Sequence, residues 1–192
     1  MRLEAAERQL LGLVGAGVVL TAALAAARPW LARMAHSTLS IAATPAPLAA
    51  ARVGAAAPTF QLQTLGGRLV SLRQLEAGGH PVLLTFFNLN VPACGREVAV
   101  LNRIAARYGR AVRVVGIDVE QDPLNVRREA RQAGIRYPIL LDQPGYVAKA
   151  YGVQGFPASA LIGPGGTLEA FHPGPFLSVR AAWPLLRRAL GG

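Results

Sequence analysis

The sequence has one cysteine, Cys94, among its 192 residues. A single cysteine cannot form a disulfide within the chain, so the disulfide framework of many exported domains is excluded. Any thiol chemistry must proceed through a sulfenic acid, a mixed disulfide or an intermolecular bond. An intermolecular disulfide through Cys94 is therefore open to the protein, and an internal one is not.

Histidine is also scarce. His36, His80 and His172 are scattered along the chain, and with one cysteine they form no cluster with metal-ligand spacing. The paired glycines have turn spacing, and none has the spacing of a phosphate-binding loop. We therefore expect no metal and no other cofactor.

Acidic residues are outnumbered, with 10 Asp and Glu against 20 Lys and Arg, which gives a net charge of +10. The arginines are scattered, and no helix-turn-helix, zinc or RNA-binding signature accompanies them. We therefore expect no nucleic acid partner. A basic surface instead suits anionic lipid headgroups or acidic partners.

Residues 10–27 contain no charged side chain. The segment is just long enough to span a bilayer as a helix. A secretory signal segment, cleaved after the alanines at 25–27, is the alternative. The length favours a retained anchor, and flanking arginines on both sides leave its orientation open.

The chain divides into four parts by composition. We expect an N-terminal tail at 1–9, the anchor or signal segment at 10–27, an Ala/Pro-rich linker at 28–52 and one folded domain at 53–192. The predicted localisation is the cell membrane, with a single pass. The side on which the domain lies must be argued on other grounds.

Strand and helix patterns alternate after residue 53. The apolar runs at 81–88 and 111–119 predict strands that are buried on both faces. Further strands are expected at 60–63, 69–71, 137–141, 158–162 and 167–171, and helices at 71–76, 92–108, 122–134, 146–151 and 179–190. This order predicts an α/β three-layer sandwich with a central mixed sheet.

Cys94 lies where the strand at 81–88 gives way to a helix that begins at Pro92. Backbone N–H groups at a helix N-terminus favour an anion, so a thiolate there has a lowered pKa and reacts faster. Glu97, about one turn further on, would tune that pKa or relay a proton. The alternatives are an inert buried cysteine and an exposed glutamate stabilised by the helix dipole.

Four sequence phrases occur in a fixed order: VGAAAPTF at 53–60, LLTFF at 83–87, YGVQGFP at 151–157 and ALIGPGG at 160–166. Together they resemble the thioredoxin-fold redoxins of the AhpC/TSA–TlpA/ResA type, over about 140 of the 192 residues. The resemblance implies a thioredoxin-like three-layer sandwich. Membrane-tethered members of that family face outside the cytoplasm, so the resemblance also implies that location.

The resemblance assigns roles to the residues around Cys94. Val91 stands where the first cysteine of Cys-x-x-Cys would be, and Cys94 stands where the second would be. Dithiol exchange within one chain is therefore excluded. Glu97 resembles the acidic residue three positions after the second cysteine. Pro157 resembles the cis-proline that faces the site, and with Phe156 and Pro92 it would hold the partner chain.

These residues support more than one function. The first hypothesis is a membrane-tethered redoxin that uses Cys94 for monothiol oxidoreductase or peroxiredoxin-like antioxidant activity, with an external thiol or protein disulfide as partner. The alternative is a redox-inactive module that binds a polypeptide in the site groove. A copper-delivery role, known for some tethered members, is disfavoured by the missing cysteine pair.

Overall fold

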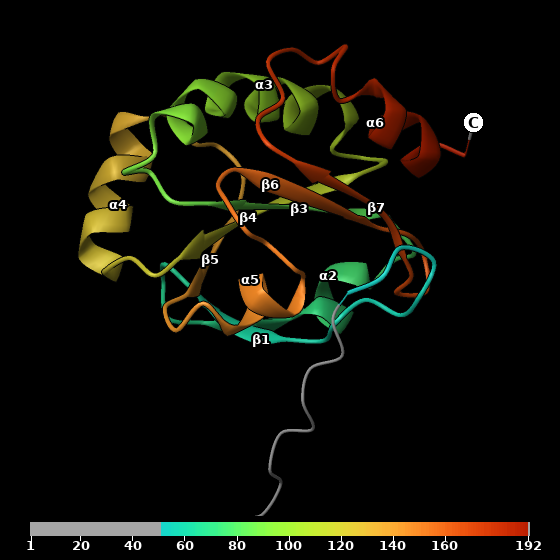
Figure 1. Ribbon diagram of the computed structural model, residues 1–192, viewed down its shortest axis with the longest axis horizontal. Helices are drawn as coiled ribbons and strands as arrows, with labels where there is room; N and C mark the ends of the chain where they lie inside the picture. The colour runs from blue at the N-terminus through green and yellow to red at the C-terminus, as the bar shows by residue number, and fades with distance from the viewer. Residues whose placement is uncertain (1–50, 192) are drawn as a thin grey trace, which may run out of the picture. The chain divides into compact units, whose positions relative to one another are not determined.

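The computed structural model describes residues 51–191, which form one seven-stranded sheet with helices on both faces (Figure 1). The strand order is β2-β1-β5-β4-β3-β6-β7. The strands are β1 Gln61–Thr64, β2 Leu69–Ser71, β3 Val82–Phe87, β4 Arg113–Val119, β5 Ile139–Asp142, β6 Ala158–Ile162 and β7 Leu168–Pro173. β3, β4 and β5 are parallel, and the other pairings are antiparallel. The expected mixed sheet is confirmed.

Five helices cover the two faces of this sheet. They are α2 Leu72–Glu76, α3 Pro92–Tyr108, α4 Pro123–Gln132, α5 Tyr146–Ala150 and α6 Trp183–Ala189. α3, α4 and α6 pack on one face, and α2 and α5 pack on the other (Figure 1). The three expected layers are therefore present.

The central strands are buried as their apolar runs predict. All six residues of β3 are buried, and six of the seven residues of β4 are buried. Successive side chains of β3 pack on opposite faces of the sheet. Phe86 packs on the face covered by α5, and Phe87 packs on the face covered by α3 and α4. Because both faces are covered, a run without alternation is the expected pattern for these strands.

Local sequence signals set the helix starts. The Asp122 side chain accepts hydrogen bonds from the N–H groups of Leu124 and Asn125, and Pro123 takes the first helical position of α4. Ser71 and Gln74 form a reciprocal capping box at α2. The predicted N-cap of α4 is confirmed.

The last helix differs from its prediction, because α6 begins at Trp183 and not at residue 179. Pro184 explains the difference. A proline is tolerated in the first turn of a helix, but further inside it removes a hydrogen bond and clashes with the preceding turn. Residues before Trp183 form turns instead, held by the Ser178 side chain, which accepts from the N–H of Ala181.

The expected tail, anchor or signal segment and most of the linker lie outside the described residues. Within residues 51–191, no helix is both long enough and apolar enough to cross a membrane.

Candidate functional site

The turn that carries Cys94 connects the end of β3 to the start of α3. The N–H of Val91 donates to the carbonyl of Asn88, and the N–H of Cys94 donates to the carbonyl of Val91, both at 2.9 Å. The Asn88 side chain donates to the carbonyl of Val119 at 3.0 Å, which ties the turn to the end of β4. Cys94 is therefore held in the first turn of α3, directly above the carboxyl ends of two central strands.

The thiol of Cys94 is buried, because the residue is only 3% exposed. It packs with Phe87 of β3, Val126 of α4 and Leu141 of β5, and half-buried Val91 packs against the same cluster. Pro92, at the first position of α3, is exposed. Val91 thus lies beside Cys94, in the position that the first cysteine of a redox pair would occupy.

The pKa of Cys94 is raised, which contradicts the expectation from the helix N-terminus. Burial of the thiol is the largest cause, and the nearby carboxyls of Glu97 and Asp118 raise the pKa further. A backbone hydrogen bond from Asn88 lowers it and is outweighed. The expectation of a lowered pKa was wrong because it considered only the helix end, and not the burial of the thiol or the carboxyls near it.

Glu97 is buried, so the prediction of an exposed helix-start glutamate is excluded. Its Oε1 accepts a 2.7 Å hydrogen bond from the N–H of Phe176, and its Oε2 accepts a long 3.5 Å bond from the hydroxyl of Thr85. Burial raises the pKa of Glu97 to about 7, although both hydrogen bonds act to lower it. Glu97 therefore connects α3 to β3 and to the segment that follows β7.

Asp118 of β4 is a second buried carboxyl, and sequence reasoning missed it. It is 1% exposed, and neither of its carboxylate oxygens has a hydrogen-bond partner among the described residues. Burial, followed by the charge of Glu129, raises the pKa of Asp118 to about 7. The available signal was one charged residue in the otherwise apolar strand Val-Val-Gly-Ile-Asp-Val.

The peptide bond between Phe156 and Pro157 is cis, as predicted. β6 begins at Ala158, which pairs with Phe86 near the end of β3, so the cis bond lies at the same edge of the sheet as the Cys94 turn. Phe156 packs against the cluster that contains Cys94. A hollow of about 480 Å³ adjoins the cis peptide bond, and its lining includes Phe156, Pro157 and Phe171. The structure thus places Cys94 and Phe156 in one cluster, with Pro157 beside it.

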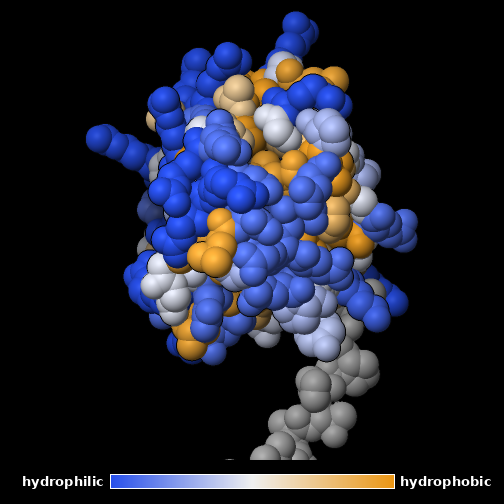
Figure 2. Space-filling model, turned by 90° about the vertical axis from the view of Figure 1, so that its left-hand side faces the viewer, coloured by the Kyte–Doolittle hydropathy of each residue, from blue (hydrophilic) through white to orange (hydrophobic). Residues whose placement is uncertain are grey.

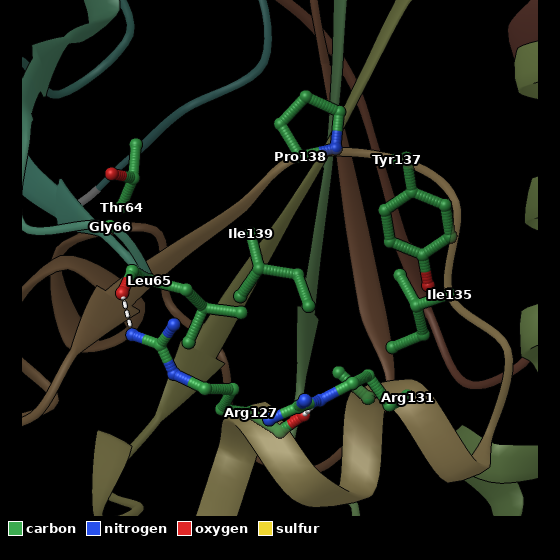
Figure 3. A pocket seen from close by; sticks show the side chains of 10 residues that line it. Thr64, Leu65, Gly66, Arg127, Arg131, Ile135, Tyr137, Pro138 and Ile139 are labelled. Carbon is green, nitrogen blue, oxygen red and sulfur yellow. Dashed lines mark hydrogen bonds between the residues drawn. The ribbon is translucent and has the colours of Figure 1, made fainter. Parts of the chain in front are cut away.

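A separate groove of about 500 Å³ runs between α4 and the start of β5 (Figure 3). Arg127 donates a hydrogen bond to the carbonyl of Leu65 across it, and Arg131 donates to the carbonyl of Arg127 at 3.1 Å. Tyr137 lines the groove. Burial raises the pKa of Tyr137, and the charges of Glu97 and Cys94 raise it further, so this groove backs onto the Cys94 cluster.

The outer surface on the side of α4 is mostly hydrophilic, with separate apolar patches (Figure 2). Leu124, near the start of α4, is 76% exposed and contributes one such apolar side chain.

The mixed sheet between two helical layers, with a cysteine in the first turn of α3 and a cis-proline at the same edge, defines a thioredoxin-like α/β fold. The chain belongs to the AhpC/TSA family, which residues 53–171 match. It is similar to the thiol-disulfide oxidoreductase ResA of Halalkalibacterium halodurans, at 31% identity over 65% of this chain and 70% of that protein. ResA of Geobacillus thermodenitrificans is 32% identical to this chain, over 65% of this chain and 71% of that protein. The predicted TlpA/ResA type is confirmed.

Solved structures agree with this assignment. A putative thiol:disulfide interchange protein DsbE from Chlorobium tepidum superposes with a TM-score of 0.68 at 25% identity, covering 74% of this chain and all of that one. The exposed lipoprotein thioredoxin Etrx1 of Streptococcus pneumoniae gives a TM-score of 0.58 at 25% identity, covering 68% of this chain and 98% of that one. The thioredoxin-like fold is thus found by sequence and by structure.

Proposed function

We propose that this protein is a thiol–disulfide oxidoreductase that works through one thiol, Cys94. The observation that carries the proposal is the placement of Cys94 in the first turn of α3, packed in one cluster with Phe156 of the cis peptide bond. Relatives at 31% and 32% identity are named thiol-disulfide oxidoreductases, which supports the same class of chemistry. The partner is a protein disulfide or an external thiol.

The proposed reaction is thiol–disulfide exchange. The sulfur of Cys94 attacks one sulfur of a partner disulfide, the partner S–S bond breaks, and the departing sulfur leaves as a thiolate and takes up a proton. Cys94 then carries a mixed disulfide. In the second step the thiolate of an external thiol attacks the partner sulfur of the mixed disulfide, so the bond between the Cys94 and partner sulfurs breaks. The Cys94 sulfur leaves as a thiolate and takes up a proton, and the partner group remains in a new disulfide with the external thiol.

Burial determines how this thiol behaves. Because its pKa is raised, Cys94 is largely protonated at neutral pH and attacks slowly until it loses its proton. The nearby charge of Glu97 contributes to that pKa, and this is the role we assign to Glu97. Pro92, Phe156 and Pro157 would hold the extended partner chain at the rim of the site. Half-buried Val91 packs against the cluster that contains Cys94, so it lies where a partner chain would approach.

The test compares the full-length protein with its Cys94→Ser variant, using a fluorescent disulfide-linked peptide and, separately, hydrogen peroxide. Intact-mass spectrometry should detect one disulfide-linked peptide adduct on the wild type and none on the Cys94→Ser variant. Ala93→Ser, one residue earlier on the same helix, is the matched control and should react as the wild type does. If Cys94→Ser left both exchange and peroxide consumption unchanged, the proposal would be abandoned.

A second candidate is a redox-inactive module that binds a polypeptide in the same groove. The 3% exposure of Cys94, together with valine in place of the other cysteine, favours it. This candidate predicts partner binding that is unchanged by Cys94→Ser and weakened by Phe156→Ala. The two candidates are separated by measuring the affinity of each variant for a partner captured from the native membrane fraction. The oxidoreductase forms a covalent complex that requires Cys94, whereas the binding module does not.

We propose further that residues 10–27 tether the protein to the cell membrane with the domain outside the cytoplasm. The uncharged apolar run in the sequence supports this placement, as does the similarity to a protein described as an exposed lipoprotein. Deletion of residues 10–27 should release the protein from the membrane fraction. Protease added to intact spheroplasts should digest the domain; full protection would reverse the proposed orientation.

A further inference from the structure

The groove between α4 and the start of β5 has an apolar floor (Figure 3). The apolar side chains that line it are those of Leu65, Ala130, Ile135, Pro138 and Ile139. The groove shares no lining residue with the hollow beside the cis peptide bond. Its volume of about 500 Å³ lies in the range of sites that bind small molecules.

Two arginines border this apolar floor. Arg127 and Arg131 are one turn apart on α4, and both line the groove. Within residues 51–191, neither forms an ion pair with a carboxylate, whereas Arg128 of the same helix lies 3.7 Å from Glu129. Their hydrogen bonds go to the backbone carbonyls of Leu65 and Arg127. Because a guanidinium has five N–H donors, each arginine keeps donors for a ligand.

The bond from Arg127 to the carbonyl of Leu65 crosses the groove from α4 to the turn after β1 (Figure 3). It fixes one guanidinium in place and bridges the groove, which suits a short ligand better than a polypeptide that runs through. A planar guanidinium donates two parallel hydrogen bonds to a carboxylate, so the two arginines favour that head group.

We propose that this groove binds a small aliphatic carboxylate, with its head group on Arg127 and Arg131 and its chain on the apolar floor. An uncharged apolar ligand would leave the guanidinium groups unpaired, and an inorganic anion would leave the floor unused. The net charge of +10 also favours an anionic ligand. This binding site goes beyond the proposed oxidoreductase function and does not depend on the reactivity of Cys94.

The experiment measures the protection of single arginines in the full-length protein, with octanoate as the probe. Phenylglyoxal modifies accessible arginines, and Arg127, Arg128 and Arg131 are all exposed. Peptide mass spectrometry after chymotrypsin digestion locates each modification. Octanoate should slow the modification of Arg127 and Arg131 in a saturable manner and leave Arg128 unaffected. Equal protection of all three arginines, or of none, overturns the inference.

Two shorter comparisons separate the head group from the chain. Acetate has the carboxylate without the chain, and 1-octanol has the chain without the charge. Each buried methylene group contributes roughly fourfold in affinity, so acetate should need a concentration at least about tenfold higher for half protection. Octanol should not protect the arginines. Protection by acetate or by 1-octanol at the octanoate concentration overturns the inference.

Two variants test the role of the arginines. Arg131→Gln should raise the octanoate concentration that half protects Arg127 by about tenfold, because a charge-assisted hydrogen bond is lost. Arg128→Gln removes the same charge from the same helix and should have no effect. Circular dichroism verifies that both variants fold. Equal weakening by the two variants would show that net charge alone acts, and it overturns the inference.

A hexaglutamate peptide tests the other occupant of opposite charge. It should protect Arg127 and Arg131 only at concentrations above those of octanoate, because it offers no aliphatic chain to the floor. Protection at lower concentrations than octanoate would assign the groove to an acidic polypeptide and overturn the inference.

Discussion

The backbone N–H of Phe176 donates a 2.7 Å hydrogen bond to Oε1 of Glu97, although the two residues are 79 positions apart in the sequence. This bond joins the helix that carries Cys94 to the segment after β7. The same carboxyl lies close enough to the thiol to raise its pKa. One buried side chain thus holds the fold together and sets the electrostatics of the site.

Glu97→Ala should destabilise the domain, because the buried N–H of Phe176 would lose its acceptor. An unsatisfied buried donor costs about 1–3 kcal/mol. Glu97→Gln keeps an acceptor oxygen of the same shape and should cost less. Urea unfolding of the two variants measures the difference, and equal losses would mean that the hydrogen bond is not the stabilising feature.

The stability of the domain should fall as pH rises from about 4 to about 7. Asp118 and Glu97 have folded-state pKa values near 7, above their ordinary values of 3.8 and 4.5, so the folded state binds more protons in this window. Each shift corresponds to a few kcal/mol, at roughly 1.4 kcal/mol per pKa unit.

The Asp118→Asn variant tests that pH dependence. It should lose stability less steeply between pH 4 and 7, because one of the two shifted carboxyls is gone. Chemical unfolding at a series of pH values gives the slope. A slope identical to that of the wild type would show that Asp118 does not titrate as we describe.

Val91→Cys should create a working dithiol. Val91 and Cys94 are three residues apart in one turn, with the N–H of Cys94 2.9 Å from the carbonyl of Val91, a spacing that brings the two Cα atoms within the range of a disulfide. Thiol counting should show two thiols after reduction and none after oxidation, and turnover of a disulfide peptide should rise. The double variant Val91→Cys, Cys94→Ser is the control and should lack the internal disulfide.

Gly116→Ala should destabilise the domain by about 1–3 kcal/mol through overpacking. A Cβ at Gly116 would lie 2.7 Å from the ring of Phe87 and 3.0 Å from the ring of Tyr137, both near the Cys94 cluster. Gly95→Ala is the matched control, because a Cβ there meets nothing within 4 Å. In helix α3 it should stabilise the domain by up to about 1 kcal/mol. Thermal unfolding separates the two effects, and a neutral Gly116→Ala would contradict the predicted clash.

Much of the fold could be read from local patterns. The apolar runs of β3 and β4, the Asp122–Pro123 start of α4 and the cis-proline phrase around Pro157 were all recognisable before the structure. The start of α6 was missed, because the apolar periodicity from residue 179 was given more weight than the break that Pro184 imposes.

The candidate site was only half predictable. Cys94 and Glu97 lie in one helix and are three residues apart, so local reasoning found both. Asp118 comes from a different strand, and only the parallel pairing of β3 with β4 places it in the layer beneath the thiol. The raised pKa of Cys94 was not predictable either, since burial and charges from several elements outweigh the helix end that the sequence reveals.

The sequence by itself determined the number of thiols and the order of strands and helices, because these follow from residue identity and short-range periodicity. Its resemblance to the family added that Val91 stands where the first redox cysteine would be. The tertiary structure alone decided that the Cys94 thiol is buried, that Glu97 is tied to Phe176 and that the Asp118 carboxyl, buried on the same side of the sheet, has no hydrogen-bond partner within residues 51–191. The physical reason is that burial and electrostatics depend on side chains brought together from distant parts of the chain, and these set the protonation of the single thiol.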